Sequence, residues 1–283
     1  MRKRYIVATL LILLPTLAFG QSADSAKKGP WNHSIVANLN LSQASYTNWT
    51  GGGENTLAYQ ALLTGCSEDN APSATWTNTY KFTYGQARLG DHGLRKTDDQ
   101  IDIESLLKYK YDSVVNPYAA ASFRSQFTPG YNYSASDSAT MVSRFFDPAY
   151  FQESVGALYT VGALFKTRLG VAAREIVTSQ FTQYSIDPET NKPVHTLVEG
   201  GFESITELNF PIDDHILLTS KLDLFSPVKK PAQIVLRSDN GLTVKVSKYV
   251  IVNLNALFIN DASVTPKTQI KQTLALGIQY AIL

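Results

Sequence analysis

The side chains best suited to chemistry in this chain are charged residues that recur at even spacing along three successive segments. Even spacing places side chains on one face of a β-strand, because successive residues point to opposite faces. Opposite charges on paired strands attract each other, so we expect these segments to form charged ladders. Alternatively, the charges form a path for a solute, as rings of charge do in selective pores. The residues are Lys166, Arg168 and Arg174, then Glu199, Glu203 and Glu207, then Lys221.

Charged residues occupy the less apolar face of most other segments as well. A charge that faced lipid at the bilayer midplane would cost roughly 2–4 kcal/mol, whereas one that faces a wet lumen costs little. We therefore expect these side chains to line the lumen of a barrel and either plug it or leave a narrow channel. The predicted lumen-lining set is Asp102, Glu104, Lys108, Arg124, Lys166, Arg168, Arg174, Glu199, Glu203, Glu207, Lys221, Asp223, Arg237, Asp239 and Lys271.

Other residues raise the question of hydrolysis. Outer-membrane proteases need paired Asp and an Asp–His pair at the outer rim, and outer-membrane phospholipases need Ser and His on adjacent strands. The candidates are Asp91-His92, Asp98-Asp99, Asp213-Asp214-His215, and Ser179 with His195. We expect turn and loop roles for them, because Asp is common in turns and the first two groups fall in a single outer loop. The chain has no Gly-rich phosphate loop, metal-ligand spacing or nucleophile elbow, so we predict no enzyme, cofactor or metal site.

The elements that position these residues are segments in which large apolar and small or polar side chains alternate. A period of two is typical of strands, and no window shows the helical spacing of three and four. Twelve strands without a helix predict an all-β fold: a transmembrane, antiparallel up-and-down β-barrel of about 12 strands. The segments are 34–45, 55–64, 75–85, 101–111, 117–127, 151–160, 165–177, 195–210, 216–225, 234–246, 249–259 and 267–283.

The last segment shows the pattern most clearly. Leu274, Leu276, Ile278 and Tyr280 alternate with small or polar residues over about the length that a tilted strand needs to cross a bilayer. We expect it to close the barrel by pairing with 34–45. A terminal strand of this kind is also what the barrel-assembly machinery recognises, although Leu283 replaces the usual terminal aromatic residue.

The connections alternate in length. Short connections are expected at 112–116, 161–164, 211–215 and 247–248, and long ones at 128–150 and 178–194; the connection 64–74 is an exception. Long loops outside and short turns on the periplasmic side are typical of outer-membrane barrels. A secreted β-sandwich is the alternative, although loops of this length are uncommon in one.

The N-terminus has the features of a secretory signal peptide over residues 1–20, with basic residues, an apolar run and small residues at the end. Its removal lowers Lys plus Arg from 25 to 22 against 24 Asp plus Glu, which gives no case for nucleic-acid binding. We expect residues 21–30 to be a short periplasmic segment and 31–283 to be the barrel. The single Cys66 excludes a disulfide scaffold.

The opening of the mature chain resembles a known family. Its Asn-Trp and Gly-Gly signature is similar to that of an uncharacterised group of Bacteroidetes outer-membrane barrels, catalogued as domain of unknown function 3078. The resemblance implies an outer-membrane location over residues 31–283 and implies no activity or catalytic residue. We expect the glycines to form a tight turn and Trp49 to lie in the outer interface girdle. The motif residues are Asn48, Trp49, Gly51, Gly52, Gly53 and Asn55.

Two functions of different classes remain open from the sequence. One is a small porin-like channel for small solutes, and the other is a non-conducting structural or assembly barrel that docks partners through its outer loops. A hydrolase is the third reading. The expected partners are outer-membrane lipid and the assembly machinery of a Gram-negative bacterium.

Overall fold

The computed structural model describes residues 30–45, 53–134 and 137–283. The predicted signal peptide and residues 21–29 lie outside them. Twelve strands form the main sheet: β1 (Trp31–Ala44), β2 (Thr56–Asn70), β3 (Ala74–Leu89), β4 (Arg95–Tyr109), β5 (Val115–Ser125), β8 (Ala149–Val161), β9 (Phe165–Val177), β12 (Thr196–Pro211), β13 (Ile216–Pro227), β14 (Val235–Lys245), β15 (Val250–Asn260) and β16 (Gln269–Ala281). Two small hairpins lie outside the main sheet, and the alternation did not predict them. One joins β6 (Gly130–Tyr133) to β7 (Ala139–Ser143), and the other joins β10 (Ile186–Asp187) to β11 (Lys192–Pro193).

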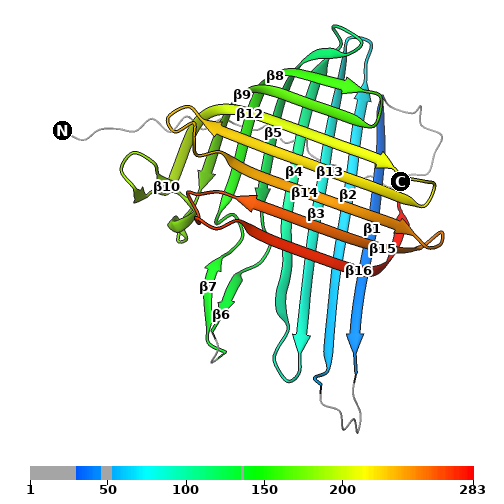
Figure 1. The fold of residues 1–283 in the computed structure, drawn as a ribbon, viewed down its shortest axis with the longest axis vertical. Helices are drawn as coiled ribbons and strands as arrows, with labels where there is room; N and C mark the ends of the chain where they lie inside the picture. The colour runs from blue at the N-terminus through cyan, green and yellow to red at the C-terminus, as the bar shows by residue number, and fades with distance from the viewer. Residues whose placement is uncertain (1–29, 46–52, 135–136) are drawn as a thin grey trace.

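The twelve strands pair with their neighbours in antiparallel fashion and close into a barrel when β16 pairs with β1 (Figure 1). The predicted twelve-strand barrel is therefore confirmed, including its closing strand. Within the described residues the one helical segment is the 3-10 turn η1 (Thr182–Tyr184). The described part of the chain holds no helix of the length and apolarity needed to cross a membrane.

The two ends of the barrel differ in the length of their connections. The β5–β8 and β9–β12 connections, 126–148 and 178–195, lie at one end, which we call the long-loop end. The other end, the short-turn end, has connections such as 162–164 and 212–215. In Figure 1 the β6–β7 hairpin projects from the long-loop end, and the C-terminus lies toward the other end.

The expected long connection 64–74 is wrong. Strand β2 continues to Asn70, and the turn is only 71–73. The apolar alternation stops earlier because the last residues of β2 are polar. The backbone ladder nevertheless continues, with Glu68 opposite Thr77 and Asp69 opposite Trp76.

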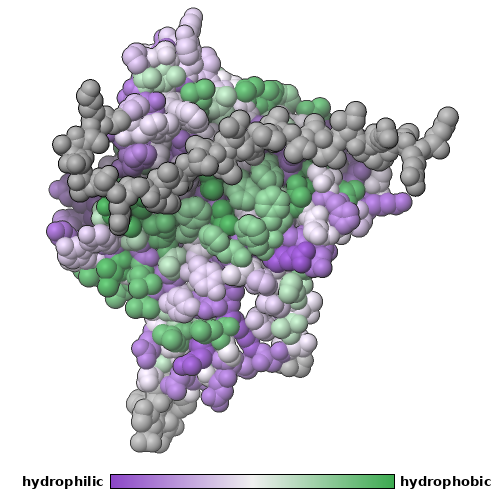
Figure 2. Space-filling model, turned by 180° about the vertical axis from the view of Figure 1, so that it is seen from behind, coloured by the Kyte–Doolittle hydropathy of each residue, from purple (hydrophilic) through white to green (hydrophobic). Residues whose placement is uncertain are grey.

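The outward face of the barrel is apolar. Large exposed side chains recur at every second position, for example Leu169 and Val171 on β9 and Leu274, Leu276 and Ile278 on β16. Figure 2 shows hydrophobic side chains gathered across the middle of one face, with hydrophilic ones above and below.

Aromatic pairs lie near both margins of this apolar face. Trp31 contacts Trp76 with ring centroids 5.5 Å apart near the short-turn end, and Phe123 contacts Phe151 at 5.1 Å near the long-loop end. Amphipathic aromatic rings favour the boundary between hydrocarbon and water.

Part of the lumen is filled by apolar side chains on the inward faces of β4, β5 and β8. Leu106, Tyr118, Ala120 and Leu158 form one buried cluster. The Tyr118 side chain on β5 reaches past β8 to β9, where Gly170 leaves room for its hydroxyl. A Cβ atom at Gly170 would collide with the Tyr118 hydroxyl and with the Val155 carbonyl.

We predict that Gly170→Ala destabilises the barrel by about 1–3 kcal/mol, the usual cost of overpacking a filled interior. Gly200→Ala is the matched control, because a Cβ there meets nothing within 4 Å. The measurement is the temperature at which the folded band is lost in a heat-modifiability gel. Equal behaviour of the two variants would show that Tyr118 is not held against Gly170.

Two local expectations concern the position of Asp98 and Asp99 and the turn of the family motif. Asp98 and Asp99 lie on strand β4 and not in an outer loop, because the β3–β4 ladder continues past the bulge at Gly85. Of the family motif, Asn48, Trp49, Gly51 and Gly52 lie outside the described residues. Gly53 has φ of +132°, which favours glycine, but the β1–β2 connection spans residues 45–55 and is longer than a tight turn.

Candidate functional site in the barrel lumen

The charged segments singled out in the sequence are neighbours in the sheet. Strand β12 lies between β9 and β13, with Glu207 opposite both Lys166 and Lys221, and Glu199 opposite Arg174. The Lys166 ammonium lies 2.7 Å from the Glu207 carboxylate, and the Arg174 guanidinium 2.8 Å from that of Glu199. These are the ladders expected from opposite charges on paired strands.

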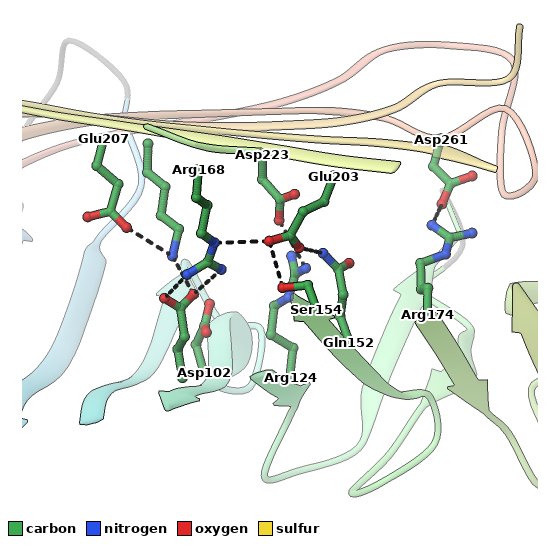
Figure 3. Close-up of polar contacts among 12 residues, drawn as sticks. Asp102, Arg124, Gln152, Ser154, Arg168, Arg174, Glu203, Glu207, Asp223 and Asp261 are labelled. Carbon is green, nitrogen blue, oxygen red and sulfur yellow. Dashed lines mark hydrogen bonds and ion pairs between the residues drawn. The ribbon is translucent and has the colours of Figure 1, made fainter. Parts of the chain in front are cut away.

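Other contacts run across the lumen between strands that are not paired. Arg168 on β9 forms a bidentate ion pair with Glu104 on β4, at 2.8 and 3.2 Å, and it also contacts Glu203 on the neighbouring strand β12 at 3.0 Å. Lys221 on β13 reaches the same Glu104 at 2.9 Å. In Figure 3 Arg168 points toward Glu203, while Arg174 and Asp261 form a separate pair.

Glu203 is the most completely satisfied of these carboxylates. Tyr118, Gln152 and Ser154 donate hydrogen bonds to it at 2.8, 2.6 and 2.7 Å, in addition to Arg168. Its side chain is only 1 % exposed. An ionised carboxylate can be buried to this degree because four donors replace its hydration.

We predict that Glu203→Gln destabilises the barrel by about 3–5 kcal/mol, because it breaks a buried ion pair and leaves the Arg168 charge with one partner fewer. The control is Glu189→Gln, which breaks the exposed Glu189–Lys229 pair and should leave stability unchanged. Urea unfolding followed by tryptophan fluorescence measures both. A Glu203→Gln midpoint within error of wild type would contradict a stabilising role for the network.

Two cavities lie inside the barrel, one above the other. The outer cavity, of about 380 Å³, lies toward the long-loop end and is lined there by Ser143, Tyr184 and Asp261. The inner cavity, of about 460 Å³, is lined toward the short-turn end by Thr64 and Asn209. Their walls come from strands around the barrel, so both belong to the lumen.

Four residues line both cavities: Ser122, Arg124, Asp223 and Arg237. The Arg124 guanidinium on β5 lies 3.3 Å from the Asp223 carboxylate on β13, so this ion pair spans the lumen between the cavities. Arg237 lies beside it on β14, opposite Asp223 in the ladder. We call Arg124, Asp223 and Arg237 the junction.

Arg237 differs from the other charged residues of the outer cavity. Each of those has a partner: Asp98 with Lys271, Asp99 with Lys96, Arg124 with Asp223, and Arg174 with Asp261. Among the described residues, no ion pair or hydrogen bond holds the Arg237 guanidinium. The junction therefore presents to both cavities a positive charge without a direct ion-pair partner among the described residues, although the nearby Asp102, Asp239 and Asp223 offset part of it.

The structure places the predicted lumen-lining residues as follows. Nine of them line the inner cavity: Asp102, Glu104, Arg124, Lys166, Glu207, Lys221, Asp223, Arg237 and Asp239. Arg174 and Lys271 line the outer cavity, Glu199 pairs with Arg174, and Arg168 and Glu203 lie in the buried network. Lys108 shares the strand face of Glu104 but lines neither cavity.

The sequence reasoning missed several members of the site. Tyr118, Gln152 and Ser154 were passed over because they carry no charge, although their alternation already placed Ser154 on the less apolar face. Lys81 pairs with Asp239 across the lumen at 2.7 Å. Asp261 lies in the connection that follows β15. Outside a strand, alternation in the sequence does not predict which way a side chain points.

A single aspartate ties together the two long connections at the mouth of the barrel. Asp147 accepts hydrogen bonds from the backbone N–H groups of Ser179, Gln180 and Phe181 and lies 3.4 Å from Arg144. Burial raises the pKa of Asp147, but these donors outweigh it and hold the pKa below the ordinary value of 3.8.

This lowered pKa predicts a pH dependence. A group whose folded pKa is depressed contributes stability above its unfolded pKa and loses it as the pH falls through the folded value. The docking of 178–195 should therefore persist at neutral pH and weaken only in acid below the ordinary aspartate range. At pH 5, Asp147→Asn should increase cleavage within 178–195 by an acid-active protease. At a pH below both the folded and the unfolded pKa of Asp147, the substitution should change cleavage little. Equal cleavage of the two proteins at pH 5 would refute the tie.

Apart from Asp98 and Asp99, which lie on β4, the hydrolase candidates occupy turns and loops. His92 lies 3.2 Å from Asp137, a contact that joins the β3–β4 connection to the β6–β7 hairpin. Asp213 accepts hydrogen bonds from the N–H groups of His215 and Ile216, as expected for a turn. In the described chain, no hydrogen bond joins the Ser179 hydroxyl to the His195 ring, and no group of three potential metal ligands is present.

Comparison with known proteins gives a partial family match. Residues 41–131 match the model of a family described as "Protein of unknown function (DUF3078)". No curated protein matches the chain.

Solved structures with low similarity include three outer-membrane proteins. The translocator domain of the autotransporter NalP from Neisseria meningitidis is 10% identical, with 90% of each chain covered and a TM-score of 0.39. The COG4313 outer membrane channel from Pseudomonas putida F1 is 11% identical, with 88% of this chain and 94% of that chain covered and a TM-score of 0.41. OmpT, an outer membrane protein of Vibrio cholerae, is 10% identical, with 90% and 99% covered and a TM-score of 0.32. The pairing of the twelve strands by itself defines the fold of this chain.

Proposed function

We propose that this protein is an integral outer-membrane barrel of a Gram-negative bacterium that conducts small polar solutes through its lumen. The observation that carries the proposal is the pair of lumenal cavities that share the Arg124–Asp223 ion pair and Arg237.

The apolar outward face supports a membrane location. Side chains such as Leu274 (74 % exposed) and Phe202 (60 % exposed) would be costly in water and favourable in hydrocarbon. A closed barrel leaves few unpaired backbone groups for lipid. Long connections at one end and short turns at the other favour an orientation with the long-loop end outside. The motif that resembles the Bacteroidetes family agrees with this location, and a Bacteroidetes origin remains part of the proposal.

The lumen supports a conduit more than a solid plug. The outer cavity is lined by four acidic and four basic side chains: Asp98, Asp99, Asp223 and Asp261, then Arg124, Arg174, Arg237 and Lys271. Opposed charges on facing walls suit a hydrated polar solute with both donors and acceptors. The unpartnered Arg237 adds a preference for anions at the junction.

A second candidate is a non-conducting structural or docking barrel. The buried network around Glu203 and Arg168, together with the Leu106–Tyr118 cluster, fills the β4–β9 side of the lumen and favours this reading. Hydrolysis remains a third reading, and absence of peptide or phospholipid cleavage by the purified barrel would end it.

The experiment is single-channel recording of the purified barrel in planar bilayers. We expect small, discrete steps from the wild type and a several-fold larger conductance from Arg124→Ala/Asp223→Ala, because loss of this ion pair joins the two cavities. Arg237→Gln should shift the reversal potential in a KCl gradient toward lower anion preference. Lys108→Gln, which changes an inward charge that lines neither cavity, is the control and should match wild type. Silence of both wild type and the double variant across voltages and salt concentrations would reject the conduit and favour the structural barrel.

A further inference from the structure

The seam between the first and last strands is paired over a shorter length than any other pair of neighbouring strands in the described barrel. The ladder of β1 with β16 joins Val36–Asn40 to Gly277–Ala281, and toward the short-turn end backbone hydrogen bonds of Ile35 with Ile282 and Leu283 extend it. Strand β1 pairs with β2 along its whole length, and β16 pairs with β15 up to Gln269. Toward the long-loop end, residues 41–44 of β1 and 273–276 of β16, which would face each other if the register continued, therefore form no ladder pairs in the described structure.

Unpaired backbone groups are costly in a bilayer, so such an edge calls for a physical reason. Continuing the register would place Ser42 opposite Ala275 and Ala44 opposite Thr273, yet these pairs do not form in the described structure. Asn40 marks the point of separation. The Asn40 side chain lies over Gly277, so a Cβ atom at position 277 would collide with it. The side-chain amide oxygen of Asn40 is buried and has no hydrogen-bond partner among the described residues.

Side chains, and not the backbone ladder, connect the two strands beyond this point. The Asn40 amide donates to Gln60 at 2.8 Å, and Gln60 donates to Asp98 at 2.6 Å. Asp98 forms an ion pair of 2.7 Å with Lys271 on β16. This chain, which we call the latch, runs from β1 through β2 and β4 to β16. Side chains can separate and reform without breaking a β-ladder.

The latch separates two different environments. On its inner side lies the outer cavity, whose wall includes Asp98, Gln269 and Lys271. On its outer side the same two strands expose Leu41, Leu274 and Leu276, at 56 %, 74 % and 58 %. An opening here would join a charged, hydrated cavity directly to the apolar outer face.

We propose that the β1–β16 seam is a lateral port through which a single-chain anionic amphiphile passes between the outer cavity and the bilayer. The anionic head lies in the outer cavity near Arg237, which has no ion-pair partner among the described residues, while the hydrocarbon chain leaves between residues 41–44 and 273–276. The inference rests on the proposed conduit and goes beyond it, because it adds a second class of solute and a lateral exit. No covalent step is involved; the Asp98–Lys271 pair opens and closes.

The test uses double-cysteine variants of the full barrel in lipid nanodiscs, in a Cys66→Ser background that removes the single native thiol. Ser42→Cys/Ala275→Cys would lock the seam shut, because these positions face each other when the register continues. Asn38→Cys/Gln279→Cys is the matched control, since those residues already pair on the same two strands. Ladder partners lie within the range that a disulfide can bridge.

The probe is a long-chain fatty acid with a photoreactive diazirine near the chain end. We expect labelling concentrated at 41–44 and 273–276, reduced about tenfold by the disulfide of Ser42→Cys/Ala275→Cys and restored by reduction. The disulfide of Asn38→Cys/Gln279→Cys should leave labelling unchanged. Arg237→Gln should also reduce labelling, because it removes the charge that holds the head group.

A second variant covers the case in which the locking disulfide does not form. Asp98→Asn/Lys271→Gln removes the charge pair of the latch and should raise labelling at the seam about threefold. Lys229→Gln breaks the exposed ion pair with Glu189, which lines neither cavity, and should leave labelling unchanged. Labelling spread evenly over the apolar face, or insensitive to the lock and to the latch variant, would overturn the lateral port. So would a stable dimer joined through the free edge of β16, seen by native mass measurement.

The same preparations separate this inference from the conduit itself. KCl conductance measured on the locked barrel reports the path along the barrel axis, which the disulfide does not block. Persistent conductance with unaltered labelling would reject only the port. Loss of both conductance and labelling in the unlocked protein would reject both.

Discussion

Neutralisation of charge across the lumen is the interaction on which the rest of this structure depends. A barrel of twelve strands is too narrow to hydrate every inward charge fully, so an inward carboxylate needs a cation or several donors. Glu104 and Asp223 meet this need through cations on strands that are not their neighbours, and Glu203 does so through Arg168 on the neighbouring strand β9 together with Tyr118 on β5. These contacts fix the distance between opposite walls and therefore the shape of the two cavities.

The need to neutralise inward charge also explains Gly170 and Tyr118, on the side of the lumen that side chains fill. Tyr118 reaches Glu203 only because Gly170 leaves room beside its hydroxyl. The apolar cluster with Leu106 and Leu158 shields this carboxylate from the short-turn end. Shielding strengthens the ion pairs, because electrostatic attraction increases as water is excluded. Side chains of this network and cluster fill part of the lumen, and Glu104 and Leu106 also form part of the wall of the inner cavity.

Closure of the barrel is least complete where the two ends of the sheet meet. Every other strand is joined to its neighbour by a turn or a long connection, whereas β1 and β16 meet without one. The structure places an ion pair, Asp98–Lys271, where the ladder stops. The solute proposals concern both features: the junction controls a path along the axis, and the latch controls a path through the wall.

The alternation of the sequence by itself determined the twelve strands, their antiparallel order and which face of each strand is apolar. A period of two is a property of neighbouring residues in the sequence. It appears in any strand that has one face against a uniform surrounding, such as lipid or water. It also placed Lys166, Glu207 and Lys221 on neighbouring strands, because consecutive strands of an up-and-down barrel are adjacent. It misjudged the end of β2 and the position of Asp98, since a ladder can continue through polar residues.

Only the tertiary structure decided which charges meet across the lumen. The pairs Arg168–Glu104 and Lys81–Asp239 join residues far apart in sequence, and their approach depends on the stagger and curvature of the closed sheet. The lack of a partner for Arg237 and the early end of the β1–β16 ladder are consequences of the same closure. Periodicity specifies the direction in which a side chain leaves its strand, but the partner it meets is set by how the sheet closes.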